Sequence, residues 1–192
     1  MDVMDGRLKS AVAPTPLGAI GVVWSDAGIV ATWIHAGTTD RARAHMRRAH
    51  PSAVAAAPPG PIAAGLDEIA ALLAGTPVDL RAAVLDMRSV PDFDRRVYAV
   101  ARTIPPGATM TYGEVAKALG EEPIRARDVG QALARNPFAP IVPCHRIVAA
   151  GGKLGGYSAP GGASTKRRLL ELEGAEIVAP SRQPGLFDAI TS

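Results

Sequence analysis

The chain has 192 residues and a mass of 19.8 kDa, enough for one ordinary domain or two small ones with a real hydrophobic core. Its single cysteine excludes an intramolecular disulfide and a cysteine-rich zinc site, and we expect neither a metal nor another cofactor. The net charge is +3, and the stretch 93–173 holds 12 basic and 7 acidic residues, so the positive excess lies in the C-terminal half. Such an excess attracts phosphate backbones, although it is also common in proteins that never meet nucleic acid.

No segment has the pattern of a membrane span or of a secretory signal. The longest apolar stretch, 53–74, is interrupted by Pro-Pro-Gly-Pro at 58–61 and by two acidic residues at 67–68. The first ten residues contain two aspartates and no apolar segment. We therefore expect a soluble, cytoplasmic protein that acts as a monomer and has no membrane partner.

The N-terminal half has the pattern of a small α/β unit. The pattern predicts a β-hairpin, two helices and a third strand, which in chain order span 16–24, 28–34, 40–50, 62–74 and 78–85. A Ser-Asp-Ala-Gly turn joins the two strands of the hairpin. Thr39 and Asp40 are the expected caps of the first helix, because their side-chain oxygens can accept from the first free backbone N–H groups.

Short helices separated by glycine and proline are predicted in the C-terminal half. The first spans 93–103. Thr111 and Glu114 have the spacing of a capping box, which starts a second helix that ends at Gly120. A third helix is expected within 121–137. Two short helices around a tight turn are typical of a helix-turn-helix, a motif found both in DNA-binding proteins and in proteins that bind no DNA.

The last of these helices has two distinct faces. The side chains expected to pack inward are Ala126, Val129, Gly130 and Leu133. Arg127, Gln131 and Arg135 are spaced by four and form a stripe on another face. A cationic stripe suits nucleic acid, but an ordinary solvated helix face has the same pattern.

The residues with the clearest chemical meaning are Cys144 and His145. A lone cysteine beside a β-rich run is usually a buried small hydrophobe, but imidazole is the usual base for activating a thiol. Successive side chains of a strand point to opposite faces, so this pair requires a turn or a bridging water. A third group should orient the histidine, and Glu173, at the end of a helix predicted over 164–173, is the candidate. The alternative for Glu173 is an ordinary exposed carboxylate.

Five short motifs follow one another in a specific order. They are Thr111-Tyr112-Gly113-Glu114, Arg127-Asp128-Val129-Gly130-Gln131-Ala132-Leu133, Asn136-Pro137, Pro143-Cys144-His145-Arg146 and Gly156-Tyr157-Ser158. In this order and spacing they resemble the O6-alkylguanine-DNA alkyltransferases, the methylated-DNA-protein-cysteine methyltransferases. The close resemblance covers 93–174, and Pro-Cys-His-Arg followed by two aliphatic residues is its most specific part. The N-terminal half matches only loosely, in its early hairpin.

The resemblance implies a fold and an activity. Over 1–90 it implies a ribonuclease-H-like α/β domain with an antiparallel sheet and helices. Over 91–176 it implies a mainly helical domain that carries a helix-turn-helix and the active site, and 177–192 remain as a tail. The implied activity is DNA repair by direct reversal: an irreversible, stoichiometric transfer of an alkyl group from O6-alkylguanine in double-stranded DNA to Cys144. O4-alkylthymine stays open as a second substrate.

The resemblance also implies roles in the chemistry. Cys144 would be the acceptor thiolate, activated through a water by His145, which Glu173 would orient. Asn136 would hold the turn that presents the cysteine. Tyr157 would donate a proton or a hydrogen bond to the guanine ring.

Further implied roles concern the DNA. Tyr112 would crowd the target phosphate, and Arg127 would enter the base stack in place of the flipped nucleotide. Gln131 and Arg135 are expected DNA contacts on the same helix, which would lie in the minor groove. The pocket around the guanine is expected to be lined by Pro143, Tyr157 and Ser158.

Elementary chemistry supports this scheme independently. A methyl group inside a duplex cannot be reached until its base is flipped out, which costs on the order of a few kcal/mol. The thioether product has no acyl group that water could hydrolyse, and no second cysteine exists to remove the methyl group. Each molecule should therefore react once.

The alternatives are a non-reactive sensor of alkylated DNA, a helix-turn-helix regulator and a Cys-His hydrolase. Cys144 argues against the sensor, because those relatives replace the reactive cysteine. A hydrolase would have no use for the helix pair that carries Tyr112 and Arg127. Two departures from the family pattern are Asp128, expected to weaken DNA binding, and a longer link at 159–162 on which the alignment of Glu173 depends. The tail at 183–192 has no interpretation from its sequence.

Overall fold

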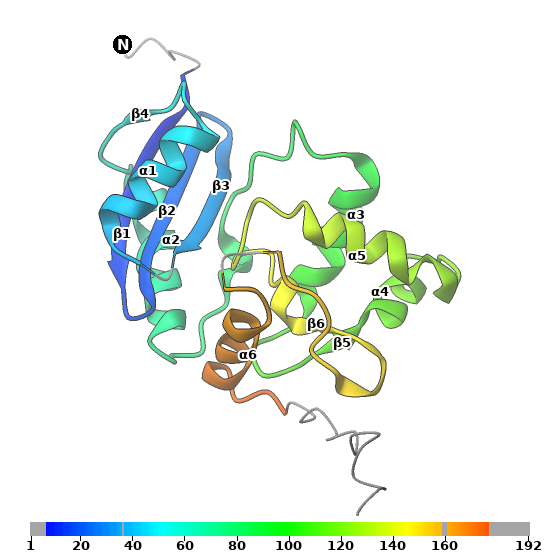
Figure 1. The fold of residues 1–192 in the computed structure, drawn as a ribbon. Helices are drawn as coiled ribbons and strands as arrows, with labels where there is room; N and C mark the ends of the chain where they lie inside the picture. Colours follow the sequence, from blue (N-terminus) through cyan, green and yellow to red (C-terminus); the bar gives the residue numbers. More distant parts are fainter. Residues whose placement is uncertain (1–6, 36, 159–160, 177–192) are drawn as a thin grey trace, which may run out of the picture.

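The computed structural model describes residues 7–35, 37–158 and 161–176 (Figure 1). Its N-terminal half is a four-stranded sheet between two helices, and its C-terminal half is a group of short helices around a two-stranded sheet. The tail expected over 177–192 lies outside the described residues. No helix in the described part of the chain is long and apolar enough to cross a membrane.

The first sheet is built on the predicted hairpin. Strands β2 (Gly18–Ser25) and β3 (Gly28–His35) pair antiparallel. Gly28 has a φ of +137°, and a Cβ atom at this position would lie 2.7 Å from the carbonyl oxygen of Val84. Only glycine fits this end of the turn, both in conformation and in space.

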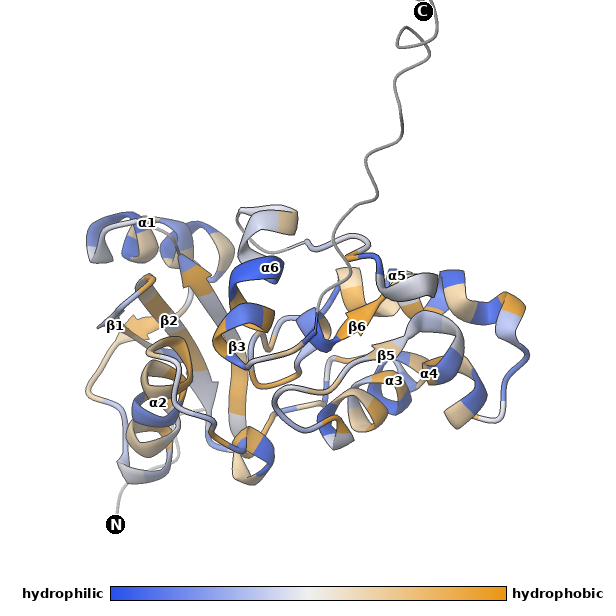
Figure 2. Ribbon diagram, turned by 90° about the horizontal axis from the view of Figure 1, so that it is seen from below, coloured by the Kyte–Doolittle hydropathy of each residue, from blue (hydrophilic) through white to orange (hydrophobic). Residues whose placement is uncertain are grey.

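Both faces of β2 are covered by helices. Side chains alternate along the strand, so Ile20 and every second residue after it face α2 (Gly60–Leu73) in a shared apolar core. On the opposite face, Gly21 lies against α1 (Thr39–Ala49), where a Cβ atom would be in ordinary contact with the sulfur of Met46, at 3.6 Å. Figure 2 shows the two helices on opposite sides of the sheet.

The sheet is mixed, so the expectation of an antiparallel sheet is wrong at one edge. Strand β1 (Lys9–Thr15) pairs antiparallel with β2, and β4 (Val54–Ala55) pairs parallel with β1, giving the order β3-β2-β1-β4. The sequence pattern does not predict β1, because its small side chains alternate weakly. Pro14 lies at the end of β1 that β4 does not reach, where its missing N–H group costs no hydrogen bond.

The helix starts differ slightly from the predicted ones. The N-cap of α1 is Thr38, whose side chain accepts from the backbone N–H of Arg41, and not the predicted Thr39 and Asp40. Helix α2 begins at Gly60, two residues early, with a proline in its first turn. Proline is favoured there because the missing N–H would have had no partner within the helix.

The strand expected over 78–85 is wrong for most of its length. The segment forms a one-turn 3-10 helix, Leu80–Ala82, and only Leu85 bridges to the sheet, at Ile29. Asp79 caps this turn through the backbone N–H of residue 81. Such a local side-chain hydrogen bond offers the backbone an alternative to strand pairing.

The C-terminal half begins with three helices: α3 (Asp92–Thr103), α4 (Tyr112–Ala118) and α5 (Ala126–Ala134). The predicted capping box is present at α4: Thr111 Oγ1 accepts from the backbone N–H of Glu114 at 3.2 Å, and Glu114 Oε2 accepts from that of Thr111 at 2.6 Å. The helix predicted from residue 121 onward starts instead with a 3-10 turn, Pro123–Arg125, and continues as α5.

A short parallel pair, β5 (Met110–Thr111) and β6 (Ile147–Val148), was not expected. It fixes the start of α4 beside the segment that follows Cys144. Helix α6 (Gly162–Leu172) begins two residues earlier than predicted, and Glu173 is its C-cap residue. The β5–β6 pair and the end of α6 thus lie close to the turn that carries Cys144.

The two halves share one hydrophobic core. At the free edge of β3, the backbone N–H of Thr32 donates to the carbonyl of Pro137, and its hydroxyl donates to the carbonyl of Ala139, both at 2.8 Å. The sheet therefore holds the loop that leads directly to Cys144.

Candidate active site

Cys144 begins a one-turn 3-10 helix, Cys144–Arg146, which supplies the turn that the cysteine-histidine pair requires. The loop before it is tied by Asn136. Its side-chain amide donates to the carbonyl of Val142 at 3.0 Å, and its side-chain oxygen accepts from the backbone N–H of Phe138 at 2.9 Å. Asn136 thus holds both ends of the loop that presents the cysteine.

Glu173 joins the 3-10 turn to the end of α6. Nε2 of the fully buried His145 lies 2.9 Å from Glu173 Oε1. Arg146 donates from Nε and NH2 to the two carboxylate oxygens of Glu173, at 2.9 and 2.8 Å. The structure therefore brings Glu173 to His145, as the sequence predicts, and adds Arg146 as a second partner that the sequence analysis did not anticipate.

The charges of this cluster follow from burial and hydrogen bonding. Burial disfavours the ionised form of Glu173, but the hydrogen bonds from His145 and Arg146 outweigh it and lower its pKa to about 2. Burial lowers the pKa of His145, although Glu173 opposes this. At neutral pH the pair is therefore a carboxylate beside a neutral imidazole.

A neutral imidazole in this position has one defined tautomer. Nε2 carries the proton and donates a hydrogen bond to Glu173, which leaves Nδ1 as a hydrogen-bond acceptor. Nδ1 of His145 is buried, and no group among the described residues bonds to it. His145 therefore has a basic nitrogen available for a proton.

The thiol of Cys144 requires such a base. Burial raises its pKa, and a hydrogen bond from the Asn136 side chain and the positive charge of Lys166 only partly oppose this effect. The resting group is accordingly a thiol, which becomes nucleophilic when it loses its proton.

Lys166 is a site residue that the sequence analysis missed. It is fully buried in α6, and its ammonium donates to the carbonyls of Ile147 at 2.6 Å and Gly156 at 3.2 Å. Burial lowers its pKa to about 8. The signal was available, because Lys166 shares a helix face with the buried Leu169 and Leu170 at spacings of three and four.

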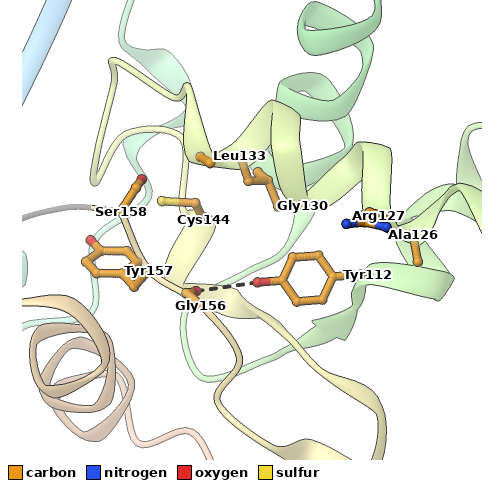
Figure 3. Close-up of a pocket in the computed structure, with 10 residues that line it drawn as sticks. Tyr112, Ala126, Arg127, Gly130, Leu133, Cys144, Gly156, Tyr157 and Ser158 are labelled. Carbon is orange, nitrogen blue, oxygen red and sulfur yellow. Dashed lines mark hydrogen bonds between the residues drawn. The ribbon is translucent and has the colours of Figure 1, made fainter.

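A cavity of about 490 Å³ opens beside Cys144. Figure 3 shows the sulfur of Cys144, the Tyr157 hydroxyl and the Ser158 side chain at one end and Arg127 at the other. The Tyr157 hydroxyl is buried without a partner among the described residues. Burial raises its pKa above the ordinary value, so it stays protonated and can donate. The third expected pocket residue, Pro143, is buried and is not part of the cavity wall.

Tyr112, the first residue of α4, lines this cavity. Its hydroxyl donates to the carbonyl of Gly156 at 3.4 Å (Figure 3). Two glycines lie against the Tyr112 ring. A Cβ atom added at Gly130 would lie 3.7 Å from the ring, and one added at Gly155 would lie 3.2 Å from it. Gly155 also has a φ of +68°, so glycine is required there by conformation and by the ring.

The inward face predicted for α5 is partly wrong. Val129 and Leu133 are buried, but Ala126 and Gly130 are only half-buried because they line the cavity. The small side chains at these two positions leave space for a ligand, whereas the sequence pattern suggests a packed neighbour.

The stripe on the outer face of α5 is divided in two. Arg127 and Gln131 are exposed, and Arg127 has no ion pair in the described part of the chain. Arg135 is committed to the buried Asp94 of α3, with both hydrogen bonds at 2.9 Å. Its pairing is therefore within the protein, and its guanidinium holds α5 against α3.

Asp128 also has a partner that the sequence analysis did not foresee. Its carboxylate pairs with Nε of Arg125. Another nitrogen of the same guanidinium, Nη1, lies 4.0 Å from the carboxylate of Glu121. The expectation that Asp128 weakens DNA binding assumed a free negative charge. The structure gives that charge a cationic neighbour at the start of α5.

The other three histidines lie in the N-terminal half. The rings of His45 and His50 lie 5.6 and 5.2 Å from the ring of Trp33, and His35 lies 6.1 Å from His45. Within the described ranges, no group of three or more His, Cys, Asp or Glu residues could hold a metal ion.

Taken together, these features define a protein whose buried, base-assisted cysteine opens into a cavity beside a pair of short helices. The family model for the DNA binding domain of 6-O-methylguanine DNA methyltransferase matches residues 92–175. The chain is 39% identical over 162 residues to the methylated-DNA--protein-cysteine methyltransferase of Methanothermobacter thermautotrophicus, covering 84% of this chain and 83% of that relative.

Solved structures agree with these similarities. The crystal structure of Mycobacterium tuberculosis O6-methylguanine methyltransferase matches with a TM-score of 0.68 and 34% identity, covering 91% of this chain and 96% of that one. The structure of Mycobacterium tuberculosis OGT in complex with DNA matches with a TM-score of 0.69 and 34% identity, covering 86% and 92%. The chain belongs to the methylated-DNA–protein-cysteine methyltransferase family.

Proposed function

We propose that this protein repairs DNA by direct reversal, taking an alkyl group from O6 of a guanine in double-stranded DNA onto Cys144. Membership of the family supports alkyl transfer to a cysteine. The observation that carries the assignment is the position of Cys144 in a cavity wall, next in sequence to a buried His145 whose Nδ1 is bonded by none of the described residues.

The reaction follows from the charges of the site. Nδ1 of His145 takes the thiol proton of Cys144 through a water, and Glu173 stabilises the imidazolium that forms. The thiolate attacks the alkyl carbon, so a carbon–sulfur bond forms while the bond from carbon to O6 breaks. The electron pair of that bond stays on the guanine. The Tyr157 hydroxyl donates to the guanine ring as this negative charge develops.

Each molecule reacts once. The thioether formed on Cys144 has no leaving group that water can displace under mild conditions, and the chain has no second cysteine. O6-methylguanine and larger O6-alkylguanines are the proposed substrates, with O4-alkylthymine as a further one.

DNA binding is assigned to α4 and α5, which form the proposed helix-turn-helix. The target nucleotide rotates out of the duplex into the cavity, with Tyr112 crowding its phosphate and the exposed Arg127 filling the gap in the stack. Gln131 contacts the DNA from the same helix face. Arg135 adds positive charge to this surface but is held by Asp94.

The same proposal extends to the architecture. The order β3-β2-β1-β4, with β4 parallel to β1, supports a ribonuclease-H-like N-terminal domain over 1–90. The helix-turn-helix and the active site then form a second domain over 91–176. The monomeric state and the cytoplasmic location stay predictions from the sequence.

The test is Cys144→Ser, assayed for binding and for transfer with a duplex that contains one O6-methylguanine. The hydroxyl has nearly the size of the thiol and is a far poorer nucleophile, so transfer should vanish while binding persists. Loss of binding in parallel with transfer would contradict the assignment. Wild-type protein that binds without reacting would instead be a sensor, and repeated turnover would indicate a hydrolase.

A further inference from the structure

A second cavity, of about 340 Å³, also borders Cys144 and is lined in part by residues of the N-terminal half. Strand β3 contributes Trp33 and Ile34 to its wall, and helix α1 contributes His45. Cys144 and Ser158 line this cavity as well as the first one. Cys144 therefore borders two cavities, of which the transfer of a methyl group uses only the first.

The geometry of the displacement limits where an alkyl chain can lie. The sulfur, the attacked carbon and O6 have to be nearly collinear, so atoms bonded to that carbon spread sideways from the line. A methyl group needs little room. Every further carbon needs space beside Cys144 that the guanine in the first cavity does not fill, and the second cavity borders the same side chain.

The walls of the second cavity suit an apolar chain. Trp33 and Ile34 supply apolar surface. Two of the polar side chains beside them are already bonded: the Thr32 hydroxyl donates to the carbonyl of Ala139, and the amide of Asn136 ties its own loop. An alkyl chain that lies against Trp33 and Ile34 leaves these hydrogen bonds intact and gains from the burial of apolar surface.

His45 closes this cavity on the α1 side. Its ring packs edge-on against Trp33, with the centroids 5.6 Å apart. Burial lowers its pKa, and the neighbouring His35 and Arg48 lower it further. At neutral pH the ring is therefore uncharged and does not repel an apolar group.

We propose that the second cavity is the subsite that receives alkyl chains longer than methyl, so that Cys144 accepts groups such as butyl from guanine O6. This inference rests on the proposed alkyl transfer and adds the place where the longer chain lies. It also gives Trp33 and His45, in the N-terminal half, a role in selecting the length of the chain.

The test changes the volume of the subsite at His45. His45→Trp fills it, His45→Ala enlarges it, and His50→Trp is the matched control, since His50 also packs on Trp33 but does not line the cavity. Single-turnover transfer is measured with two duplexes that differ only in O6-methylguanine or O6-butylguanine. His45→Trp should lower the butyl-to-methyl ratio by about tenfold or more, the discrimination typical of a pocket that loses room for a methylene group.

The other variants make the outcome unambiguous. His45→Ala should raise the same ratio, and His50→Trp should keep the wild-type value. An unchanged ratio in both His45 variants, or an equal drop in His50→Trp, would overturn the subsite. Should His45→Trp fail to fold, His45→Ala decides alone, and an unchanged ratio counts against the proposal. A wild-type protein that transfers no methyl group would contradict the proposed function instead.

Discussion

The two halves of the protein bury different kinds of side chain. The interior around β2 is almost entirely apolar, covered by α1 on one face and α2 on the other. The C-terminal half buries charged and titratable groups, namely Asp94, His145, Arg146, Lys166 and the carboxylate of Glu173. Buried charges destabilise a fold unless they are paired. The N-terminal half buries one carboxylate of this kind, Asp86, which pairs with Arg88. The comparison indicates that most of the buried ionisable groups gather in the C-terminal half, around the cysteine, and that their pairing is what keeps them from destabilising the fold.

The largest effect is expected when one partner is removed from the buried cluster of charged groups. Glu173→Ala should lower the free energy of unfolding by about 3–5 kcal/mol, because it leaves Arg146 buried without its carboxylate. Transfer should also become much slower, since His145 loses the group that fixes its tautomer. Urea unfolding and single-turnover transfer measure the two effects. Glu171→Ala, half-exposed on the same helix, is the matched control and should change neither.

A substitution in the apolar half should separate stability from chemistry. Ile69 of α2 is 1% exposed, and Ile69→Ala should lower the free energy of unfolding by about 2–5 kcal/mol. The transfer rate of the folded fraction should stay at the wild-type value. A rate that falls together with stability would show that the sheet contributes directly to the reaction.

Acid pH should destabilise the charged half specifically. The folded pKa of Glu173, about 2, lies below the value of about 4.3 for an unfolded glutamate, so the unfolded state binds more protons between these values. The contribution of Glu173 is therefore complete above about pH 4.3 and is lost as the pH falls toward 2. Melting temperatures from neutral to acid pH should fall less steeply in Glu173→Gln than in wild type. Parallel curves would contradict this assignment.

Arg127→Ala should act on the DNA and not on the thiol. Removing the guanidinium takes away the group that fills the base stack, so transfer from a duplex should slow by about tenfold, while transfer from a single strand changes little. The two rates, measured on the same alkylated oligonucleotide with and without its complement, provide the comparison. Equal losses on both substrates would rule out this role.

The smallest effect is expected at Asp128. Because Arg125 already compensates its charge, Asp128→Asn should change DNA affinity only slightly, whereas Arg125→Ala should weaken it more by exposing the carboxylate. Fluorescence anisotropy at low salt resolves such differences. A large gain in affinity for Asp128→Asn would show that the ion pair does not neutralise the carboxylate.

The features that the sequence predicted correctly depend on short spacings or on a specific motif. The capping box needs partners only three residues apart, and Thr111 and Glu114 form it. The hairpin needs a turn between two β-rich runs. The contact of Glu173 with His145 spans 28 residues. The need for a third group made Glu173 a candidate, and the resemblance to a family implied the same role.

The features that the sequence did not reveal depend on distant partners. Strand β4 pairs with β1 although the hairpin and α1 separate them in the sequence. Neither strand has a strong alternation of apolar and polar residues. The pairing of Arg135 with Asp94 joins residues 41 positions apart and changes the meaning of the stripe on α5. Whether a charged residue is free or paired within the protein cannot be decided from its own helix, because the partner comes from another element.

The proposed function requires that Cys144 accepts the alkyl group once. The most direct measurement is the intact mass of the protein after incubation with duplex DNA containing O6-methylguanine, followed by peptide mapping. We expect the addition of a single methyl group, saturating at one per molecule and located on Cys144. An unchanged mass despite binding to the damaged duplex, or a methyl group on another residue, would contradict it.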